Sequence, residues 1–104
     1  MKKLRISFRP LAKRDLFELY SYIADDAGDE IAGRYIDRIE AACMGLETFP
    51  ERGTPRDDLR AGLRTVGFER RATIVYRIAG TEVVIVRIFY GGQDYPHLLH
   101  RDED

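Results

Sequence analysis

The sequence ATIVYRIAGTEVVIVRIFY, residues 72–90, predicts a β-hairpin that forms the centre of the fold. In its first half, Ile74, Tyr76 and Ile78 recur at every second position, as in a strand with one buried face. A tight turn follows at residues 79–81. The second half, residues 82–90, is almost continuously apolar and β-branched, which is typical of a central strand buried on both faces. Residues 4–8 and 63–68 predict two further strands.

Two helices are predicted between the first strand and the others. Apolar residues recur at spacings of three and four across residues 10–26, and Pro10 suits the first position of a helix. A second apolar stripe runs from Ile31 to Phe49, where the following Pro50 ends the helix. Asp29 is the expected N-cap of this second helix. Because the link between the helices is very short, they are expected to form an antiparallel hairpin.

The element order β-α-α-β-β-β predicts an α+β fold, in which the helical hairpin packs on one face of a small antiparallel sheet. The length of 104 residues suits a single domain. We expect that domain to span residues 1–95 and to be followed by a loosely held acidic tail, residues 96–104. Residues 50–61 contain Pro50, Gly53 and Pro55, which are residues typical of turns, and are expected to form a loop.

The composition places the chain among ordinary globular proteins, with 44% hydrophobic and 34% charged residues. No apolar stretch is long enough to cross a membrane, and the N-terminus lacks the core of a signal peptide, so a cytoplasmic location is expected. A single cysteine, Cys43, excludes an internal disulfide and a multi-cysteine metal site. His97 and His100 have no convergent partners in the sequence. We therefore predict no metal and no cofactor.

Charge is strongly segregated along the chain, although the net charge is only −1. Residues 1–14 carry six bases and no acid, and residues 15–58 carry twelve acids against four bases. Residues 59–92 carry six arginines against two acids. This pattern favours a macromolecular partner, although solvated helix and strand faces would produce it equally well.

The arginines of the third block alternate with aromatic residues along the predicted strands. Arg77 and Arg87 are expected to face outward and to lie close together across the hairpin. The sheet face away from the helices would then be a mixed arginine and apolar surface that suits a protein or RNA partner. Arginine stems that merely cover an open sheet face are the alternative.

An ordered set of short motifs resembles the ParE toxins of the ParE/RelE superfamily. The resemblance covers about residues 5–95, and each motif is weak alone but the set is specific. The motifs are Arg9-Pro10-Leu11-Ala12-Lys13-Arg14-Asp15-Leu16, Tyr22-Ile23-Ala24, Leu46-Glu47-Thr48-Phe49-Pro50-Glu51-Arg52-Gly53, Gly62-Leu63-Arg64, Ile74-Val75-Tyr76-Arg77 and Val86-Arg87-Ile88-Phe89-Tyr90-Gly91-Gly92-Gln93-Asp94.

The resemblance implies a bacterial toxin of a type II toxin–antitoxin pair. Its partner would be a ParD-like antitoxin, with a DNA-binding N-terminal part and a C-terminal segment that folds over the toxin. The pair would form a hetero-oligomer that represses its own operon, so the toxin would meet operator DNA only through the antitoxin.

The resemblance also separates two activities. RelE-like members cut mRNA on the ribosome with basic residues and a tyrosine, which would fall at Thr73, near Gln93 and near Leu99 in this chain. ParE members lack that set and inhibit DNA gyrase. We therefore expect a gyrase inhibitor with no catalytic residues. A ribonuclease with a non-standard site at His97, His100 and Arg101, and a non-toxic co-repressor, are the alternatives.

Candidate contact residues follow from this interpretation. Phe17 and Tyr22 are apolar residues off the core stripe of the first helix, so we predict that they contact the antitoxin in an apolar groove between the hairpin and the sheet. For gyrase we predict contacts through arginines and polar groups of the third block. These residues are Arg64, Arg70, Arg71, Arg87, Tyr90 and Gln93.

Overall fold

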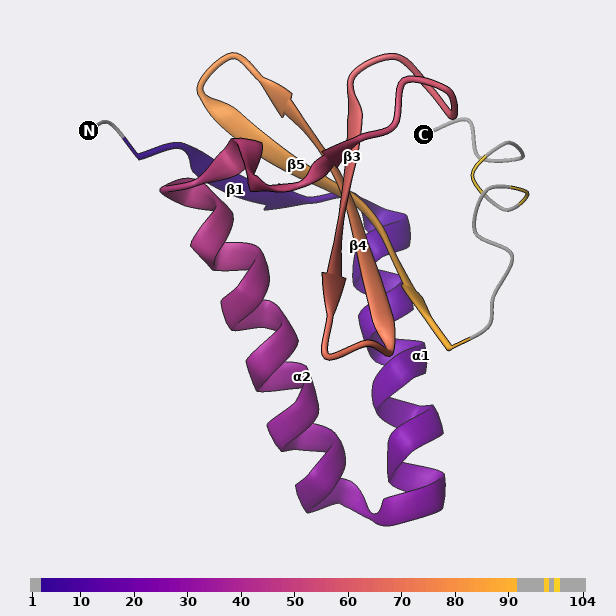
Figure 1. Cartoon of the computed structure of the whole chain (residues 1–104). Coiled ribbons are helices and arrows are strands. Elements are labelled where there is room, and N and C mark those ends of the chain that lie inside the picture. The colour runs from indigo at the N-terminus through magenta and orange to yellow at the C-terminus, as the bar shows by residue number, and fades with distance from the viewer. Residues whose placement is uncertain (1–2, 92–96, 98, 100–104) are drawn as a thin grey trace.

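The computed structural model describes residues 3–91, 97 and 99 of the chain. A helical hairpin packs against a twisted sheet, as Figure 1 shows. The elements in chain order are β1 (Arg5–Phe8), α1 (Pro10–Ala27), α2 (Asp29–Met44), the short 3-10 turns η1 (Gly45–Glu47) and η2 (Pro50–Arg52), β2 (Thr54–Pro55), β3 (Leu63–Phe68), β4 (Ala72–Ala79) and β5 (Glu82–Tyr90). The predicted α+β class and the order of the main elements are confirmed.

Helix α1 begins at Pro10 as predicted, and its apolar stripe is buried against α2 and the sheet. Gly28, with φ of 96°, separates the two helices and donates its N–H to the Ala24 carbonyl at 2.9 Å. Glycine adopts this left-handed conformation without steric cost, so the chain reverses within one residue. The predicted N-cap was wrong by one position, since Gly28 is the N-cap of α2 and Asp29 is its first residue.

Helix α2 ends at Met44, five residues before the predicted end. From Gly45 the chain tightens into 3-10 geometry, with three residues per turn instead of 3.6. The change of period keeps Leu46 fully buried but rotates Phe49 out to solvent. The predicted apolar stripe therefore holds as far as Leu46 and fails at Phe49.

The sheet has the strand order β1-β5-β4-β3-β2. Strand β1 pairs with β5 in parallel, with Phe8 opposite Ile85, while the other pairs are antiparallel. The prediction of a purely antiparallel sheet was therefore wrong for β1. Residue periodicity shows that a strand exists but carries no information on the direction of its partner. The short strand β2, in the predicted loop, extends the sheet beyond β3.

Both faces of the sheet are packed. The helix-facing core includes Leu19, Ile39, Tyr76 and Ile85. The opposite face has its own buried cluster, formed by Leu63, Val75, Val84, Val86, Phe89 and Leu99. The sheet face away from the helices, predicted to be an open surface of arginine and apolar residues, is therefore apolar and buried at this cluster. The expectation of a loose tail is also wrong for Leu99, which is only 2% exposed.

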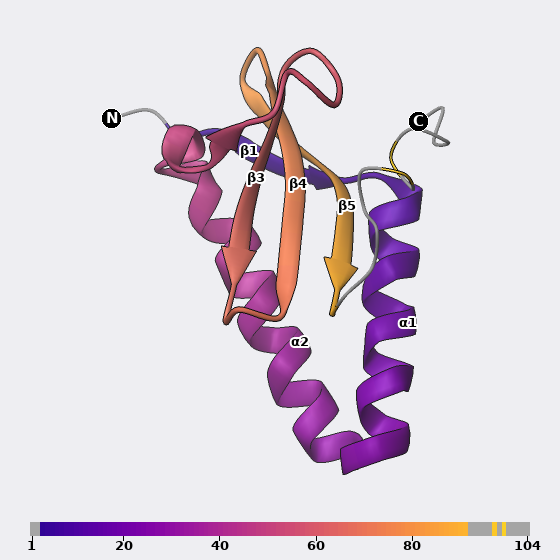
Figure 2. The same ribbon diagram turned by 45° about the vertical axis from the view of Figure 1, so that its right-hand side comes forward.

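The closed end of the helical hairpin extends past the lower ends of the strands. Figures 1 and 2 show α1 and α2 converging below the turn between β3 and β4 and below the end of β5. Ile31, on the predicted core stripe, is exposed there because none of the described strands reaches it. Ala27 and Ile31, at this end of the hairpin, line one groove of the candidate site. Within the described ranges, no helix is long and apolar enough to cross a membrane.

Candidate binding grooves beside strand β5

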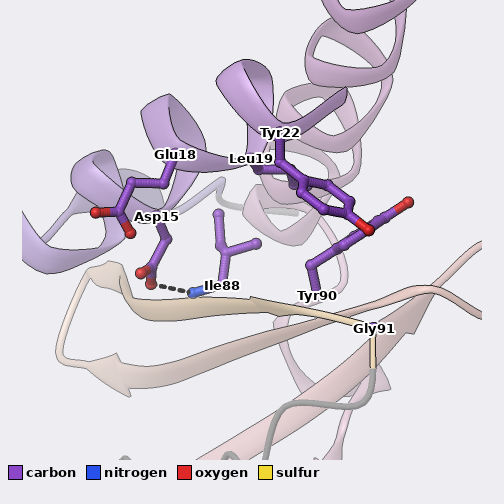
Figure 3. Close-up of a pocket in the computed structure, with 7 residues that line it drawn as sticks. All are labelled: Asp15, Glu18, Leu19, Tyr22, Ile88, Tyr90 and Gly91. Atoms are coloured by element: carbon purple, nitrogen blue, oxygen red, sulfur yellow. Dashed lines mark hydrogen bonds between the residues drawn. The ribbon is translucent and has the colours of Figure 1, made fainter. Parts of the chain in front are cut away.

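Among the described residues, strand β5 has no further strand partner on its β1 side once the pairing with β1 ends. Strand β1 ends at Phe8, opposite Ile85, and the next residue, Arg9, donates its N–H to the Ile85 carbonyl at 2.9 Å. Past this point α1 takes the place of a neighbouring strand. The Asp15 side chain on α1 accepts the Ile88 N–H at 2.9 Å, as Figure 3 shows. A carboxylate thus satisfies a backbone donor that strand pairing leaves unused.

Asp15 also forms an ion pair with Arg87. The Arg87 Nε and Nη2 atoms donate to the two Asp15 carboxylate oxygens at 2.7 and 2.9 Å. The side chains are only 13% and 9% exposed. The Arg87 guanidinium also lies 4.7 Å from the centre of the Phe89 ring, within cation–π range.

A β-bulge gives Arg87 this orientation. Val75 pairs with Arg87 and Tyr76 pairs with Ile85, so the register skips Val86. A bulge changes the direction of the side chains on its strand. The prediction that Arg77 and Arg87 lie close across the hairpin was wrong, since Arg77 is opposite Val84. Arg87, a predicted gyrase contact, has its guanidinium bound to α1.

A first groove lies between α1 and the open side of β5, with a volume of about 380 Å³. We call it the edge groove. In Figure 3 the Tyr22 and Tyr90 rings lie side by side at one end of it, with centroids 5.7 Å apart in an edge-to-face arrangement. Its lining is formed by Asp15, Glu18, Leu19, Tyr22, Ile88, Tyr90 and Gly91.

A second groove adjoins the first and lies under the overhanging helices. We call it the hairpin groove, and its volume is about 520 Å³. Tyr22 and Tyr90 line both grooves, so the two grooves adjoin at this pair of rings. Its lining is formed by Tyr22, Ile23, Asp26, Ala27, Ile31, Arg34, Tyr35, Arg38, Glu69, Arg71 and Tyr90.

The turn between β3 and β4 forms one wall of the hairpin groove. Glu69 and Arg70 both have positive φ, 49° and 60°, which is uncommon for residues other than glycine. Glu69 is held by Arg38 of α2, whose Nε and Nη2 donate to its carboxylate at 2.8 and 3.0 Å. The hydrogen bond from Arg38 lowers the pKa of Glu69. This tether holds the turn that carries the exposed Arg70 and Arg71, of which Arg71 lines the groove.

The predicted gyrase contacts do not form one patch. Arg70 and Arg71 lie at the β3–β4 turn, and the Arg71 side chain is hydrogen-bonded to that of Tyr90. Arg64 lies at the other end of β3, where its Nη2 donates to the carbonyls of Glu51 and Gly53 at 3.0 and 3.2 Å. Gln93 lies outside the described residues.

The two predicted antitoxin contacts also separate. Tyr22, 64% exposed, lines both grooves. Phe17 is 71% exposed but lines neither groove. The five-residue separation turns Phe17 about 140° away from Tyr22 around the helix axis.

Comparison with known proteins identifies the family. Residues 6–95 match the family described as the ParE toxin of the type II toxin–antitoxin system parDE. Toxin ParE3 of Caulobacter vibrioides is 36% identical over 86 residues, which cover 83% of this chain and 84% of that protein. Toxin ParE1 of the same organism is 32% identical over 90 residues, 86% of this chain and 90% of that protein. The chain belongs to the ParE toxin family.

Solved structures agree with the ParE fold. A chain of the chromosomal ParDE toxin–antitoxin system from P. aeruginosa superposes with a TM-score of 0.76 at 24% identity, covering 86% of this chain and 97% of that chain. A chain of the RelBE2 toxin–antitoxin complex from Mycobacterium tuberculosis gives a TM-score of 0.67, also at 24% identity, and covers 85% and 98%. At this identity the two likenesses show the fold, including its two helices on a mixed sheet.

Several motif residues that carry the ParE resemblance hold the chain together. The Tyr76 hydroxyl donates to the Pro50 carbonyl at 2.6 Å and accepts the Gly53 N–H at 3.0 Å. Arg64 bonds the same turn, and a Cβ at Gly53 would lie 2.5 Å from the Tyr76 hydroxyl oxygen. Three motifs far apart in the sequence therefore meet at this turn, and two others meet through the Asp15–Arg87 pair.

Sequence reasoning missed three elements of this ParE site. Asp15 lies in the first motif of the ParE resemblance, but the sequence spacing gives no sign of its partner 72 positions away. The Arg38–Glu69 tether likewise joins residues that are 31 positions apart. Tyr35 lies on an apolar helix stripe, and that pattern predicts only a place in the core. No three His, Cys, Asp or Glu side chains gather in a possible metal site within the described ranges.

Proposed function

We propose that this ParE-family toxin inhibits DNA gyrase and that a ParD-like antitoxin neutralises it. The observation that carries the proposal is the family match over residues 6–95. The antitoxin would supply the operator-binding surface of the toxin–antitoxin complex, which would be a hetero-oligomer. Both proteins would act in the bacterial cytoplasm.

Two positions support inhibition without ribonuclease chemistry. The superfamily's strand arginine would fall at Thr73, a half-buried residue opposite Phe89. The C-terminal tyrosine would fall near Leu99, which packs in the apolar cluster on the far face of the sheet. Neither side chain can transfer a proton at neutral pH. His97 is exposed, and His100 lies outside the described residues.

The edge and hairpin grooves are the surface we assign to the antitoxin. They combine exposed apolar side chains, Tyr22 and Ile31, with a side of β5 on which the described residues place no strand beyond Ile85. An antitoxin segment that lies along α1 would cover both features and remove an edge that promotes association.

The gyrase surface we assign overlaps with the antitoxin surface. The guanidinium groups of Arg64 and Arg87 are hydrogen-bonded within the chain. Arg70 and Arg71 are exposed at the β3–β4 turn, where Arg71 also bonds the Tyr90 side chain. Arg71 and Tyr90 also line the hairpin groove. An antitoxin bound there would cover part of the target-binding surface, and this overlap would explain neutralisation.

Induced expression in cells tests the proposal. The wild-type chain should arrest growth and leave relaxed or cleaved plasmid, and co-expressed antitoxin should prevent both. The Arg70→Glu/Arg71→Glu variant should lose most of the growth arrest, because the two positive charges that it lacks steer the encounter with gyrase. Lys13→Glu/Arg14→Glu, an equal charge reversal on the exposed side of α1, is the matched control and should remain toxic. Arrest with normally supercoiled plasmid would contradict gyrase as the target.

A further inference from the structure

The hydroxyl of Tyr35 is buried beside the hairpin groove without a hydrogen-bond partner. The Tyr35 side chain is 6% exposed, and its ring lies edge-to-face with Phe68 and Tyr90 at centroid distances of 5.5 and 5.9 Å. Among the residues that the structure describes, no group bonds its hydroxyl oxygen. Such groups are rare, because burial removes the hydrogen bond to water and supplies nothing in return.

The polar groups around Tyr35 are engaged with one another. The Arg38 guanidinium, 5.4 Å from the centre of the Tyr35 ring, is held by Glu69. Arg71 is hydrogen-bonded to the side chain of Tyr90. Burial, together with Tyr90 and Glu69, raises the pKa of Tyr35 to about 12. The hydroxyl therefore stays protonated at neutral pH and lacks only an acceptor.

We infer that Tyr35 and Arg71 receive an acidic side chain, an aspartate or glutamate, of the antitoxin segment that fills the hairpin groove. This inference rests on the proposed function. A carboxylate fits because it only accepts hydrogen bonds, and the site offers one hydroxyl donor and one guanidinium. The exposed Tyr22 and Ile31 would contact the apolar residues on either side of that carboxylate.

The inference predicts opposite effects on stability and on binding. Tyr35→Phe removes a hydroxyl that has no partner in the free toxin, so its unfolding temperature should stay the same or rise. In the complex the same change removes a donor to a charged acceptor. Affinity for the antitoxin should then fall at least tenfold. A hydroxyl with a structural role would lower both quantities together.

Tyr20→Phe is the matched control. Tyr20 lies on α1 outside both grooves, and its hydroxyl is hydrogen-bonded to Asp29. Its removal breaks this bond in the free toxin and in the complex alike. The unfolding temperature should fall, while affinity for the antitoxin stays within twofold of wild type.

Calorimetric titration of purified toxin with its antitoxin tests the inference. Tyr35→Phe and Arg71→Gln should each weaken binding at least tenfold, and the double variant should lose less than the product of the two. Wild-type affinity in Tyr35→Phe, or a parallel loss of unfolding temperature, would overturn the assignment. Those outcomes leave the proposed function standing as long as the wild-type chain binds the antitoxin. Failure of the wild type to bind would contradict both.

Discussion

Replacement of Asp15 by alanine should destabilise the fold strongly. The Asp15 carboxylate accepts three hydrogen bonds, at 2.7 and 2.9 Å from Arg87 and at 2.9 Å from the Ile88 N–H. Its removal leaves a cation that is only 13% exposed without its carboxylate, and a strand N–H without an acceptor. Loss of one partner of a buried pair costs about 3–5 kcal/mol. This is a large part of the roughly 5–15 kcal/mol that stabilises a typical domain.

Thermal unfolding of the free toxin, followed by circular dichroism, measures this effect. For a domain of this size, a loss of 3 kcal/mol lowers the unfolding midpoint by about 12 °C or more. Glu18→Ala is the matched control, since Glu18 is the next acid on α1 and forms only an exposed pair with Arg14 at 3.6 Å. Its midpoint should match wild type.

A double-mutant cycle separates the ion pair from general damage to α1. The Asp15→Ala/Arg87→Ala double variant should be more stable than the sum of the single changes implies, because it leaves no buried cation. An Asp15→Ala midpoint within 2 °C of wild type, or strictly additive changes, would refute the structural role given to this pair.

Other predictions concern four sites. Tyr76→Phe leaves two backbone groups without their hydroxyl partner and should cost about 2 kcal/mol or more in urea unfolding. The hydrogen bond from Arg38 holds the pKa of Glu69 below its ordinary value, so this pair stabilises the fold above about pH 4.3 and the contribution is lost as the pH falls further. Glu69→Gln should therefore flatten that part of the curve of stability against pH. An unchanged curve would argue against the tether. Leu99→Ala should cost about 2–5 kcal/mol, whereas a loose tail would give no change. Burial raises the pKa of the Cys43 thiol to about 12, so iodoacetamide at pH 8 should label it only after unfolding.

The sequence patterns predicted those parts of the fold that depend on neighbours along the chain. The stripe from Ala12 to Ile23 located α1, and the alternation around Ile74 and Tyr76 located β4. Burial of one face of a helix or strand leaves a periodic signal, and burial of both faces of a strand leaves a continuous apolar run; a single sequence shows both patterns. The order of these elements predicted their arrangement, and the ParE resemblance implied the same fold, although the parallel pairing of β1 was missed.

The missed features arise from contacts between distant segments. The bulge at Val86 changes the direction of Arg87, and no residue type in the strand indicates it. Leu99 follows a polar stretch, so its place in the far core depends on a path that local patterns do not specify. Tyr35 was correctly assigned to the core, but only the tertiary structure shows that its hydroxyl lacks a partner.

A supercoiling assay with purified gyrase tests the central claim most directly. Toxin released from its antitoxin would be titrated into gyrase and relaxed plasmid, and translating ribosomes with a reporter mRNA would receive the same toxin in parallel. We predict loss of supercoiling or accumulation of cleaved plasmid, full recovery when the antitoxin is added back, and intact mRNA. Cleaved mRNA with unaffected supercoiling would contradict the account and redirect attention to His97, His100 and Arg101 as catalytic groups.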